Sequence, residues 1–278
     1  MDPTTTPRSA SLTALGVARL RAAHQLLDGA TKILDDPISL RLLGPDTEAR
    51  IRAEIARFEA EPSQALRAHV VLRSRFAEDR LALGAARGVS QCVILGAGLD
   101  TFAYRQPRWA AGLQIFEIDH AASQAVKRSM LRDAGIEIPA NVHFGAVDFE
   151  REPLIDALSR SGVSLEQKTF FSWLGVTMYL HEDAIDAVLR TVAQFPPDSE
   201  IVFTFRNARN TMSALAERAA ELGEPWVSAF EPAALERKLR DVGFRHVEFL
   251  DPRHARAHYF AHSSLPAPRL VNTVAAIR

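Results

Sequence analysis

From Gln91 onward, short apolar runs alternate with stretches of helical periodicity, and this alternation constrains the fold of the 278-residue chain more than any other feature. Continuous apolar strands separated by helices indicate parallel strands buried on both faces. We expect five such strands, at Cys92–Leu95, Leu113–Ile118, Val142–Val147, Thr169–Leu174 and Glu200–Phe205. The pattern predicts an α/β fold with a central, mostly parallel sheet flanked by helices.

The segments on either side of this alternation have helical periodicity. From Ser11 to about Gly88 three amphipathic segments predict a helical cap. After Phe205 we expect helices at Asn210–Leu222 and Pro232–Val242 and two more strands at Arg245–Leu250 and Ala257–Ala261. We therefore divide the chain into a leader and cap at residues 1–88 and an α/β domain at residues 89–278. That domain carries a helical insertion at about 207–232, and the whole functions as one unit.

Composition narrows the class of protein. The chain has 33 Lys and Arg against 34 Asp and Glu, which gives no support for a nucleic-acid or anionic-membrane partner. No apolar run approaches the ~18 residues that a spanning helix needs, and the N-terminus does not read as a signal peptide. The single cysteine, Cys92, excludes an internal disulfide. We expect a cytoplasmic enzyme with a small-molecule substrate, and nothing in the sequence fixes its oligomeric state.

A glycine turn follows the first strand. The run Val93–Leu95 leads directly into Gly96 and Gly98, where a Cβ would block a tight turn and the approach of a ligand to the backbone. The next strand ends at Asp119, which follows Gly98 by 21 residues. This spacing suits an acid that binds ribose, because a carboxylate accepts two hydrogen bonds from a vicinal diol. The two features together predict a nucleoside-binding site.

Two further features bear on the kind of nucleoside. Thr101 stands where a dinucleotide fingerprint has its third glycine, so a nicotinamide cofactor fits this turn less well. The third strand ends in Asp148 and Phe149, an acid and a ring placed to accept from an adenine amine and to border the base. Asp148 is equally well placed to cap a helix that begins near Glu152 and Pro153.

In this order, the motifs resemble those of the leucine carboxyl methyltransferase family. The matching segments are Arg73–Phe76, Gly96–Thr101 with Tyr104 and Arg105 behind it, Phe116–Asp119 and Trp173–Leu180. The resemblance is close from about Arg67 to Phe205 and looser from Glu224 to Phe244. It implies a Rossmann-like class I methyltransferase fold, with S-adenosyl-L-methionine as the cofactor.

The resemblance also implies roles for residues at the cofactor. Those roles fall to Arg75 for the cofactor carboxylate, Gly96 and Gly98 beneath the amino-acid part, Asp119 for the ribose, and Asp148 with Phe149 for the adenine. A guanidinium fork suits a carboxylate, although without the family match Arg75 reads as a solvated helix arginine. Many relatives carry a glutamate where this chain has Leu174, which favours a more apolar pocket and leaves catalytic roles open.

The chemistry suggests which residues meet the methyl acceptor. A carboxylate acceptor is already ionised at neutral pH, whereas a hydroxyl needs a nearby histidine or acid as a base. Tyr179 and His181 are the catalytic candidates, and Tyr104 and Arg206 are candidates for lining the substrate pocket, because ligands collect at the carboxyl ends of parallel strands. Tyr179 could equally pack with its hydroxyl hydrogen-bonded, and His181 could simply open a helix.

Three histidines near the C-terminus, His254, His258 and His262, fall every fourth residue. If Ala257–Ala261 is a strand, residues four apart lie about 13 Å from each other along it and cannot share one ion. We therefore expect no metal site.

These features predict an S-adenosylmethionine-dependent O-methyltransferase that acts on a carboxylate or hydroxyl of a small metabolite. One alternative is an NAD(P)-dependent oxidoreductase, favoured only by the generic geometry of a glycine turn and an acid. Another is a non-catalytic S-adenosylmethionine-binding protein, suggested by Leu174. Titration with S-adenosylhomocysteine and with NAD(H) distinguishes a methyltransferase from the oxidoreductase. An open acceptor cavity beside the methyl group of a bound cofactor would contradict the non-catalytic alternative.

Overall fold

The five predicted strands form the centre of the fold. The computed structural model describes residues 12–209, 214–269 and 271–278. The strands are β1 (Gln91–Leu95), β2 (Gln114–Asp119), β3 (Val142–Ala146), β4 (Thr169–Trp173) and β5 (Glu200–Thr204). They pair in parallel, and β1, β4 and β5 are buried along their whole length. The prediction of parallel strands buried on both faces is confirmed.

Two more strands complete a seven-stranded sheet of order β3-β2-β1-β4-β5-β7-β6. The predicted strand at Arg245–Leu250 is β6 (His246–Phe249). The last strand, β7 (Thr273–Ile277), lies between β5 and β6 and is antiparallel to both. The sequence analysis did not predict β7. The carboxyl ends of β1, β2, β4 and β5 meet at one edge of the sheet, so residues that follow these strands are brought together there.

The predicted strand at Ala257–Ala261 is wrong, because this segment belongs mostly to a helix, α11 (Pro252–Tyr259). The carboxylate of Asp251 caps α11 by accepting from the backbone N–H groups of Arg253 and His254. His254 and His258 therefore stack on one face of the helix, with ring centroids 5.5 Å apart. The spacing argument against a shared ion fails for this pair. In the part of the chain that the structure describes, no group of three or more His, Cys, Asp or Glu could hold a metal ion.

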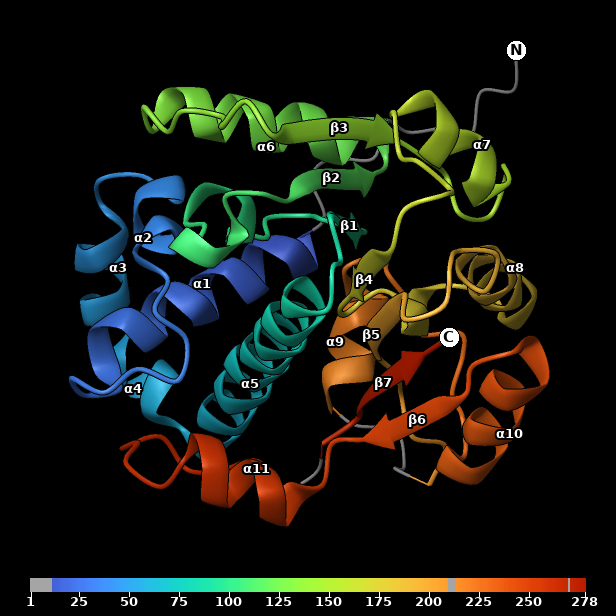
Figure 1. Ribbon diagram of the computed structural model, residues 1–278. Helices are drawn as coiled ribbons and strands as arrows, with labels where there is room; N and C mark the ends of the chain where they lie inside the picture. Colours follow the sequence, from blue (N-terminus) through green and yellow to red (C-terminus); the bar gives the residue numbers. More distant parts are fainter. Residues whose placement is uncertain (1–11, 210–213, 270) are drawn as a thin grey trace.

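Helices cover both faces of the sheet (Figure 1). On one face α7 (Leu154–Arg160), α8 (Glu182–Val192) and α10 (Pro232–Val242) pack on the strands. On the other face lie the long α5 (Glu61–Ala86), α11 and the 3-10 segment η1 (Phe102–Tyr104). A further helix, α6 (Ala121–Asp133), connects β2 to β3, and short 3-10 turns lie at Arg108–Ala110 (η2) and Thr177–Tyr179 (η3).

The predicted cap consists of α1 (Leu12–Leu27), α2 (Pro37–Leu42), α3 (Thr47–Ala53) and α4 (Ile55–Glu59), which gather beside α5 (Figure 1). The predicted leader lies outside the described residues, which begin at Leu12. The insertion after β5 contains α9 (Ala214–Glu221). The division near residue 88 stays a prediction.

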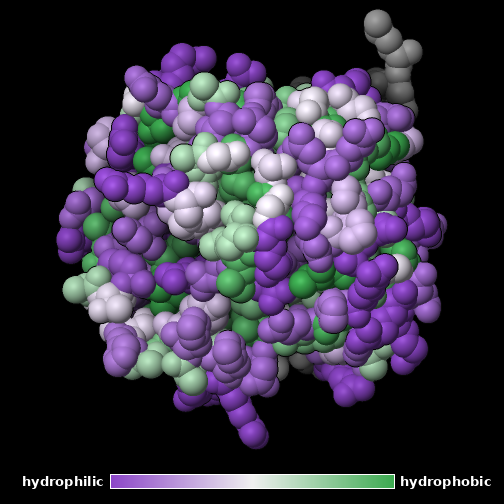
Figure 2. Space-filling view, viewed as in Figure 1, coloured by the Kyte–Doolittle hydropathy of each residue, from purple (hydrophilic) through white to green (hydrophobic). Residues whose placement is uncertain are grey.

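The face of the molecule seen in Figure 2 is mainly hydrophilic, with hydrophobic residues exposed in small areas between the polar ones. Of the helices described, none has both the length and the apolar character that crossing a membrane requires.

Candidate active site

The glycine turn closes tightly after β1. Gly96 and Gly98 have φ values of +63° and +44°, a region that side chains other than glycine rarely adopt. A Cβ on Gly96 would lie 2.4 Å from Cγ2 of Val176, in the segment that follows β4. The turn then leads into η1 rather than directly into an α-helix. Glycine is therefore required at Gly96 by its conformation and by the neighbouring strand end.

Asp119 lies against this turn, as the spacing predicts. Its Oδ2 accepts from the N–H of Gly98 at 2.5 Å, and its Oδ1 accepts from the N–H of His120 at 2.6 Å. Burial raises the pKa of Asp119, and the two backbone N–H groups act in the opposite direction. Each carboxylate oxygen has a second lone pair, so Asp119 can still accept from the hydroxyls of a ribose.

A half-buried cation to which the sequence analysis gave no role, Arg73, faces the same edge of the sheet. A Cβ on Gly175 (φ +77°) would lie 2.8 Å from Nη1 and 2.9 Å from Nη2 of Arg73. The buried Nε of Arg73 has no hydrogen-bond partner among the described residues. Burial and the charge of Arg21 lower the pKa of Arg73 to about 10, so it stays charged at neutral pH. A buried N–H of a charged group without a hydrogen-bond partner is costly, so this arginine is suited to an anionic ligand.

Arg75, the predicted ligand of the cofactor carboxylate, is placed differently. Its Nε donates to Asp79 at 2.8 Å and its Nη1 to the carbonyl of Ile33 at 3.3 Å, and its side chain is 43% exposed. Two residues along a helix correspond to a rotation of about 200°, so Arg75 and Arg73 project in nearly opposite directions. The structure brings Arg73 to the strand ends beside the glycine turn, and it pairs Arg75 with Asp79.

The predicted adenine residues follow β3, beside the end of β2. The N–H of Val147 donates to the carbonyl of Asp119 at 3.0 Å, and the ring of Phe149 lies 6.2 Å from that of Trp173. The carboxylate of Asp148 accepts from the N–H of Glu150 at 3.1 Å and thereby stabilises a turn. The alternative that Asp148 caps the next helix is wrong, because the N-cap of α7 is Pro153.

Tyr104 and His181, two of the acceptor candidates, point elsewhere. The hydroxyl of Tyr104 donates to the buried Glu117 at 2.9 Å, and Glu117 forms an ion pair with Lys127 at 2.7 Å. His181 is exposed at the N-cap of α8, where its backbone N–H donates to Glu150 at 2.8 Å. The alternative that His181 lies at the start of a helix therefore agrees with its position.

Tyr179 and Arg206, the other two candidates, lie at the carboxyl ends of the strands. Tyr179 closes η3, with its hydroxyl beside Thr13 and Trp226, and burial raises the pKa of Tyr179. Its hydroxyl is therefore protonated at neutral pH and can donate a hydrogen bond. Arg206 is half-buried and directly follows β5 and Phe205.

The N-terminal helix α1 covers the glycine turn, which no motif in the sequence predicted. The Cβ of Ala14 would lie 3.5 Å from a Cβ on Gly98, and the guanidinium of Arg21 donates to the carbonyl of Leu99. The same guanidinium bonds the fully buried Asp36 at 3.1 Å.

The carboxylate of Asp36 connects the cap helices to the segment that follows the glycine turn. Besides Arg21, it accepts from the N–H of Ser39 at 3.1 Å, which caps α2, and lies 3.5 Å from Nε of Arg105. Arg105 follows η1 and also bonds Glu78 of α5 at 2.9 Å. Cap, turn and α5 are thus joined by buried charged groups.

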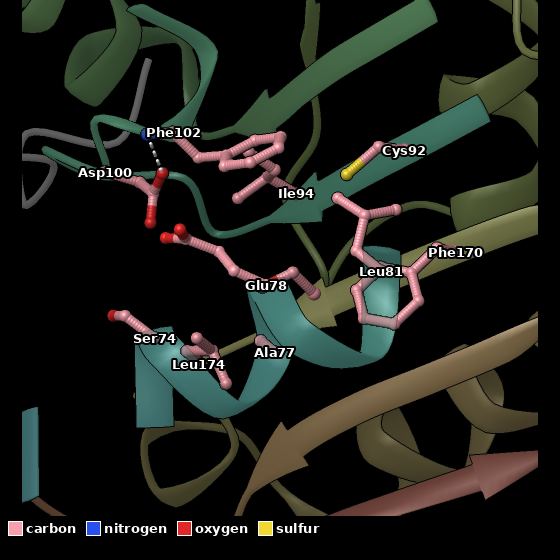
Figure 3. A pocket seen from close by; sticks show the side chains of 11 residues that line it. Ser74, Ala77, Glu78, Leu81, Cys92, Ile94, Asp100, Phe102, Phe170 and Leu174 are labelled. Atoms are coloured by element: carbon pink, nitrogen blue, oxygen red, sulfur yellow. Dashed lines mark hydrogen bonds between the residues drawn. The ribbon is translucent and has the colours of Figure 1, made fainter. Parts of the chain in front are cut away.

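A small cavity lies between α5 and β1, lined partly by Leu174 (Figure 3). In Figure 3 the carboxylate of Glu78 points toward that of Asp100, which accepts from the N–H of Phe102 at 2.8 Å. Burial raises the pKa of Glu78, while Arg105 acts in the opposite direction. The volume of about 20 Å³ is room for a single water, so this cavity is too small for a methyl acceptor.

The fold and the site together define a class of protein. A sheet with an antiparallel β7 inserted beside β5, and an acid of β2 bonded to a glycine turn after β1, is that of a class I S-adenosylmethionine-dependent methyltransferase. The chain belongs to the leucine carboxyl methyltransferase family, whose sequence model matches residues 14–193.

Relatives and solved structures agree with this assignment. The chain is 34% identical over 271 residues to the Bacillus subtilis (strain 168) protein named "Putative S-adenosyl-L-methionine-dependent methyltransferase YktD", covering 87% of this chain and 88% of that protein. Its fold is similar to that of a DUF574 family protein from Streptomyces avermitilis (TM-score 0.58, 14% identity, 94% of this chain and 95% of the other). It is also similar to a "putative methyltransferase" from Thermobifida fusca (TM-score 0.55, 18% identity, 94% and 92%). These findings favour S-adenosylmethionine over the nicotinamide alternative.

Proposed function

We propose that this methyltransferase moves the methyl group to an oxygen of a small metabolite, a carboxylate or a hydroxyl, and acts in the cytoplasm. The observation that carries the proposal is the half-buried Arg73, whose buried Nε has no hydrogen-bond partner among the described residues, beside the glycine turn to which Asp119 is hydrogen-bonded. The description of the family as leucine carboxyl methyltransferases supports oxygen as the target atom.

The residues at the strand ends fit the cofactor. Arg73, rather than Arg75, would bind its carboxylate, because the buried Nε of Arg73 has no partner in the described part of the chain, whereas Nε of Arg75 donates to Asp79. The bare backbone at Gly96 and Gly98 would pass beneath the amino-acid part, and Asp119 would accept from the ribose hydroxyls. Asp148 and Phe149 would border the adenine from the end of β3.

The cofactor supplies a methyl group that is already activated on a sulfonium, so the chain has to align the acceptor and exclude water. Tyr179 suits an aligning role, since its half-buried hydroxyl keeps its proton and can donate to the acceptor. His181 is exposed at a helix N-terminus, and Tyr104 is bonded to Glu117, so we give neither a chemical role.

A calorimetric titration with S-adenosylhomocysteine tests the cofactor site. Arg73→Gln should weaken binding about 10- to 150-fold, because a hydrogen bond to a charged group contributes roughly 1.5–3 kcal/mol. Arg75→Gln is the matched control on the same helix and should change the affinity less than about twofold. The reverse ranking would contradict the assignment of Arg73.

A mass-shift screen of acids and phenols with a labelled methyl donor tests the reaction. Methyl esters or ethers among the products support the proposal, and methylated amines or thiols would refute it. Binding of S-adenosylhomocysteine without turnover of any compound would favour the non-catalytic alternative.

A further inference from the structure

The two halves of α1 differ in how tightly they pack. None of the residues at 12–17 is buried, whereas Ala18 and Ala22 in the second half are fully buried. The second half is also held by a buried ion pair, in which Nε of Arg21 lies 3.1 Å from the carboxylate of Asp36. Segments with few buried contacts open at a lower free energy than segments that are fully packed. The first half of α1 can therefore move away while the second half stays in place.

A glycine stands close to the boundary between these halves. Gly16 lies inside the helix, its φ is outside the left-handed region, and a Cβ added to it would meet no atom within 4 Å. Neither conformation nor packing therefore requires a glycine at this position. Glycine weakens a helix interior relative to alanine, because it has more backbone freedom to lose. Gly16 thus marks the point at which α1 bends most easily.

The first turn of α1, residues 12–15, lies against the crevice that we assign to the cofactor. A Cβ added to Gly98 would lie 3.5 Å from the Cβ of Ala14. The hydroxyl of Thr13 lies beside that of Tyr179, which in turn interacts electrostatically with Arg73. This single helical turn therefore extends from the glycine turn toward the arginine that we propose for the cofactor carboxylate.

A hydrogen bond joins this first turn to the segment that follows α9. The hydroxyl of Thr13 donates to the carboxylate of Glu224. The segment around Glu224 is itself anchored to η3, because the N–H of Val227 donates to the carbonyl of Met178 at 2.8 Å. The hydroxyl of Ser228 also donates to a carbonyl of η3, at 2.8 Å. The lightly packed end of α1 is thus bonded to a partner that is fixed to the sheet.

From this arrangement, and resting on the proposed function, we propose that the first turn of α1 is a lid that hinges at Gly16 and that the bond between Thr13 and Glu224 holds it closed. S-adenosylmethionine enters the crevice, and S-adenosylhomocysteine leaves it, while the lid is open. The closed lid excludes water from the methyl group during transfer.

This mechanism makes a specific prediction about binding rates. A change at the hinge or at the Thr13–Glu224 bond alters the closing of the empty and the occupied crevice by the same factor. It therefore changes the association and dissociation rate constants together and leaves the affinity nearly unchanged. A residue that contacts the cofactor directly would instead change the affinity.

Stopped-flow measurement of S-adenosylhomocysteine binding to the full chain, followed by tryptophan fluorescence, tests the lid. Gly16→Ala stiffens the hinge without a steric clash, so both rate constants should fall about two- to fivefold. Thr13→Val removes the hydroxyl and keeps the shape of the side chain, so both rate constants should rise about 3- to 10-fold. The dissociation constant should stay within about twofold in both variants.

Two control variants make the same chemical changes elsewhere. Gly112→Ala alters an exposed glycine that also has no atom within 4 Å of its added Cβ. Thr191→Val removes a hydroxyl that donates to the carbonyl of Ala187 within α8 at 3.0 Å. Both controls should leave the two rate constants unchanged.

Three results would overturn the lid. They are rate constants that stay the same in Gly16→Ala or in Thr13→Val, equal changes in the matched control, and a change in only one of the two rate constants. Failure of the unmodified chain to bind S-adenosylhomocysteine would overturn the proposed cofactor site, and the lid with it.

Discussion

Gly175→Ala should impair cofactor binding by displacing Arg73. The new Cβ would lie 2.8 Å from Nη1, 2.9 Å from Nη2 and 3.1 Å from Cζ of the Arg73 guanidinium. Ordinary contacts of this kind are several tenths of an ångström longer, and the guanidinium is the end of a flexible side chain, so it moves while the backbone stays. The substitution therefore changes the position of the charge without removing it.

Two effects of different size are expected. The left-handed conformation at Gly175 (φ +77°) costs a residue with a Cβ roughly 1–2 kcal/mol of folding stability. Gly162→Ala (φ +86°) should cost about the same, because its Cβ would meet no atom within 4 Å. Displacement of Arg73 should cost a further 1.5–3 kcal/mol or so of binding, about 10- to 150-fold in the dissociation constant for S-adenosylhomocysteine, and only in Gly175→Ala.

A double-mutant cycle read by calorimetry and urea unfolding separates the two effects. In an Arg73→Gln background, Gly175→Ala should weaken S-adenosylhomocysteine binding by less than about twofold, since the displaced group is already gone. An equal loss of affinity with and without Arg73, or an equal loss in Gly162→Ala, would refute the reasoning.

Three further outcomes are expected. Asp119→Ala should weaken S-adenosylhomocysteine binding at least about tenfold with unchanged circular dichroism, and unchanged affinity would remove its ribose role. Lys127→Met leaves the buried Glu117 without its cation and should lower the free energy of unfolding by roughly 3–5 kcal/mol in urea; a loss below about 1 kcal/mol would show that the pair is not needed. Below pH 6.5 the unfolded chain protonates His69 while the folded chain does not, down to a pKa of about 3. The free energy of unfolding should therefore decrease as the pH is lowered below 6.5, by up to about 1.4 kcal/mol per pH unit. His69→Gln should reduce this decrease, measured by urea unfolding at pH 6.5 and pH 5. An unchanged decrease in the variant would contradict the prediction.

The core of the fold could be predicted because its signal is local. Buried strands after Gln91 carry the apolar runs that parallel pairing requires, and the turn at Gly96 and Gly98 with Asp119 follows from conformation and spacing. β7 was missed because its position between β5 and β6 depends on where the chain returns, which no local pattern encodes. The helix α11 did carry a signal, the Asp251 cap followed by Pro252, which outweighs the short apolar run near its end.

The arginine that we propose for the cofactor carboxylate shows a different limit. Arg73 and Arg75 occupy the same helix and the same motif, and the choice between them depends on which side of α5 faces the sheet. That orientation is set by contacts such as Arg80 with Glu200, more than a hundred residues apart in the chain. Gly175, whose bare backbone leaves room for the guanidinium, was the one local hint of the answer.

The carboxylate of Asp36 links helices α1 and α2 to the glycine turn, where we propose that the nucleoside binds. It is shared by α1, the first turn of α2 and Arg105, and breaking such a buried charged contact costs several kcal/mol. Deleting α1 and α2 to obtain a shorter enzyme would therefore also disrupt the glycine turn. Conversely, a nucleoside bound at this turn would stabilise the packing of α1 and α2 against it.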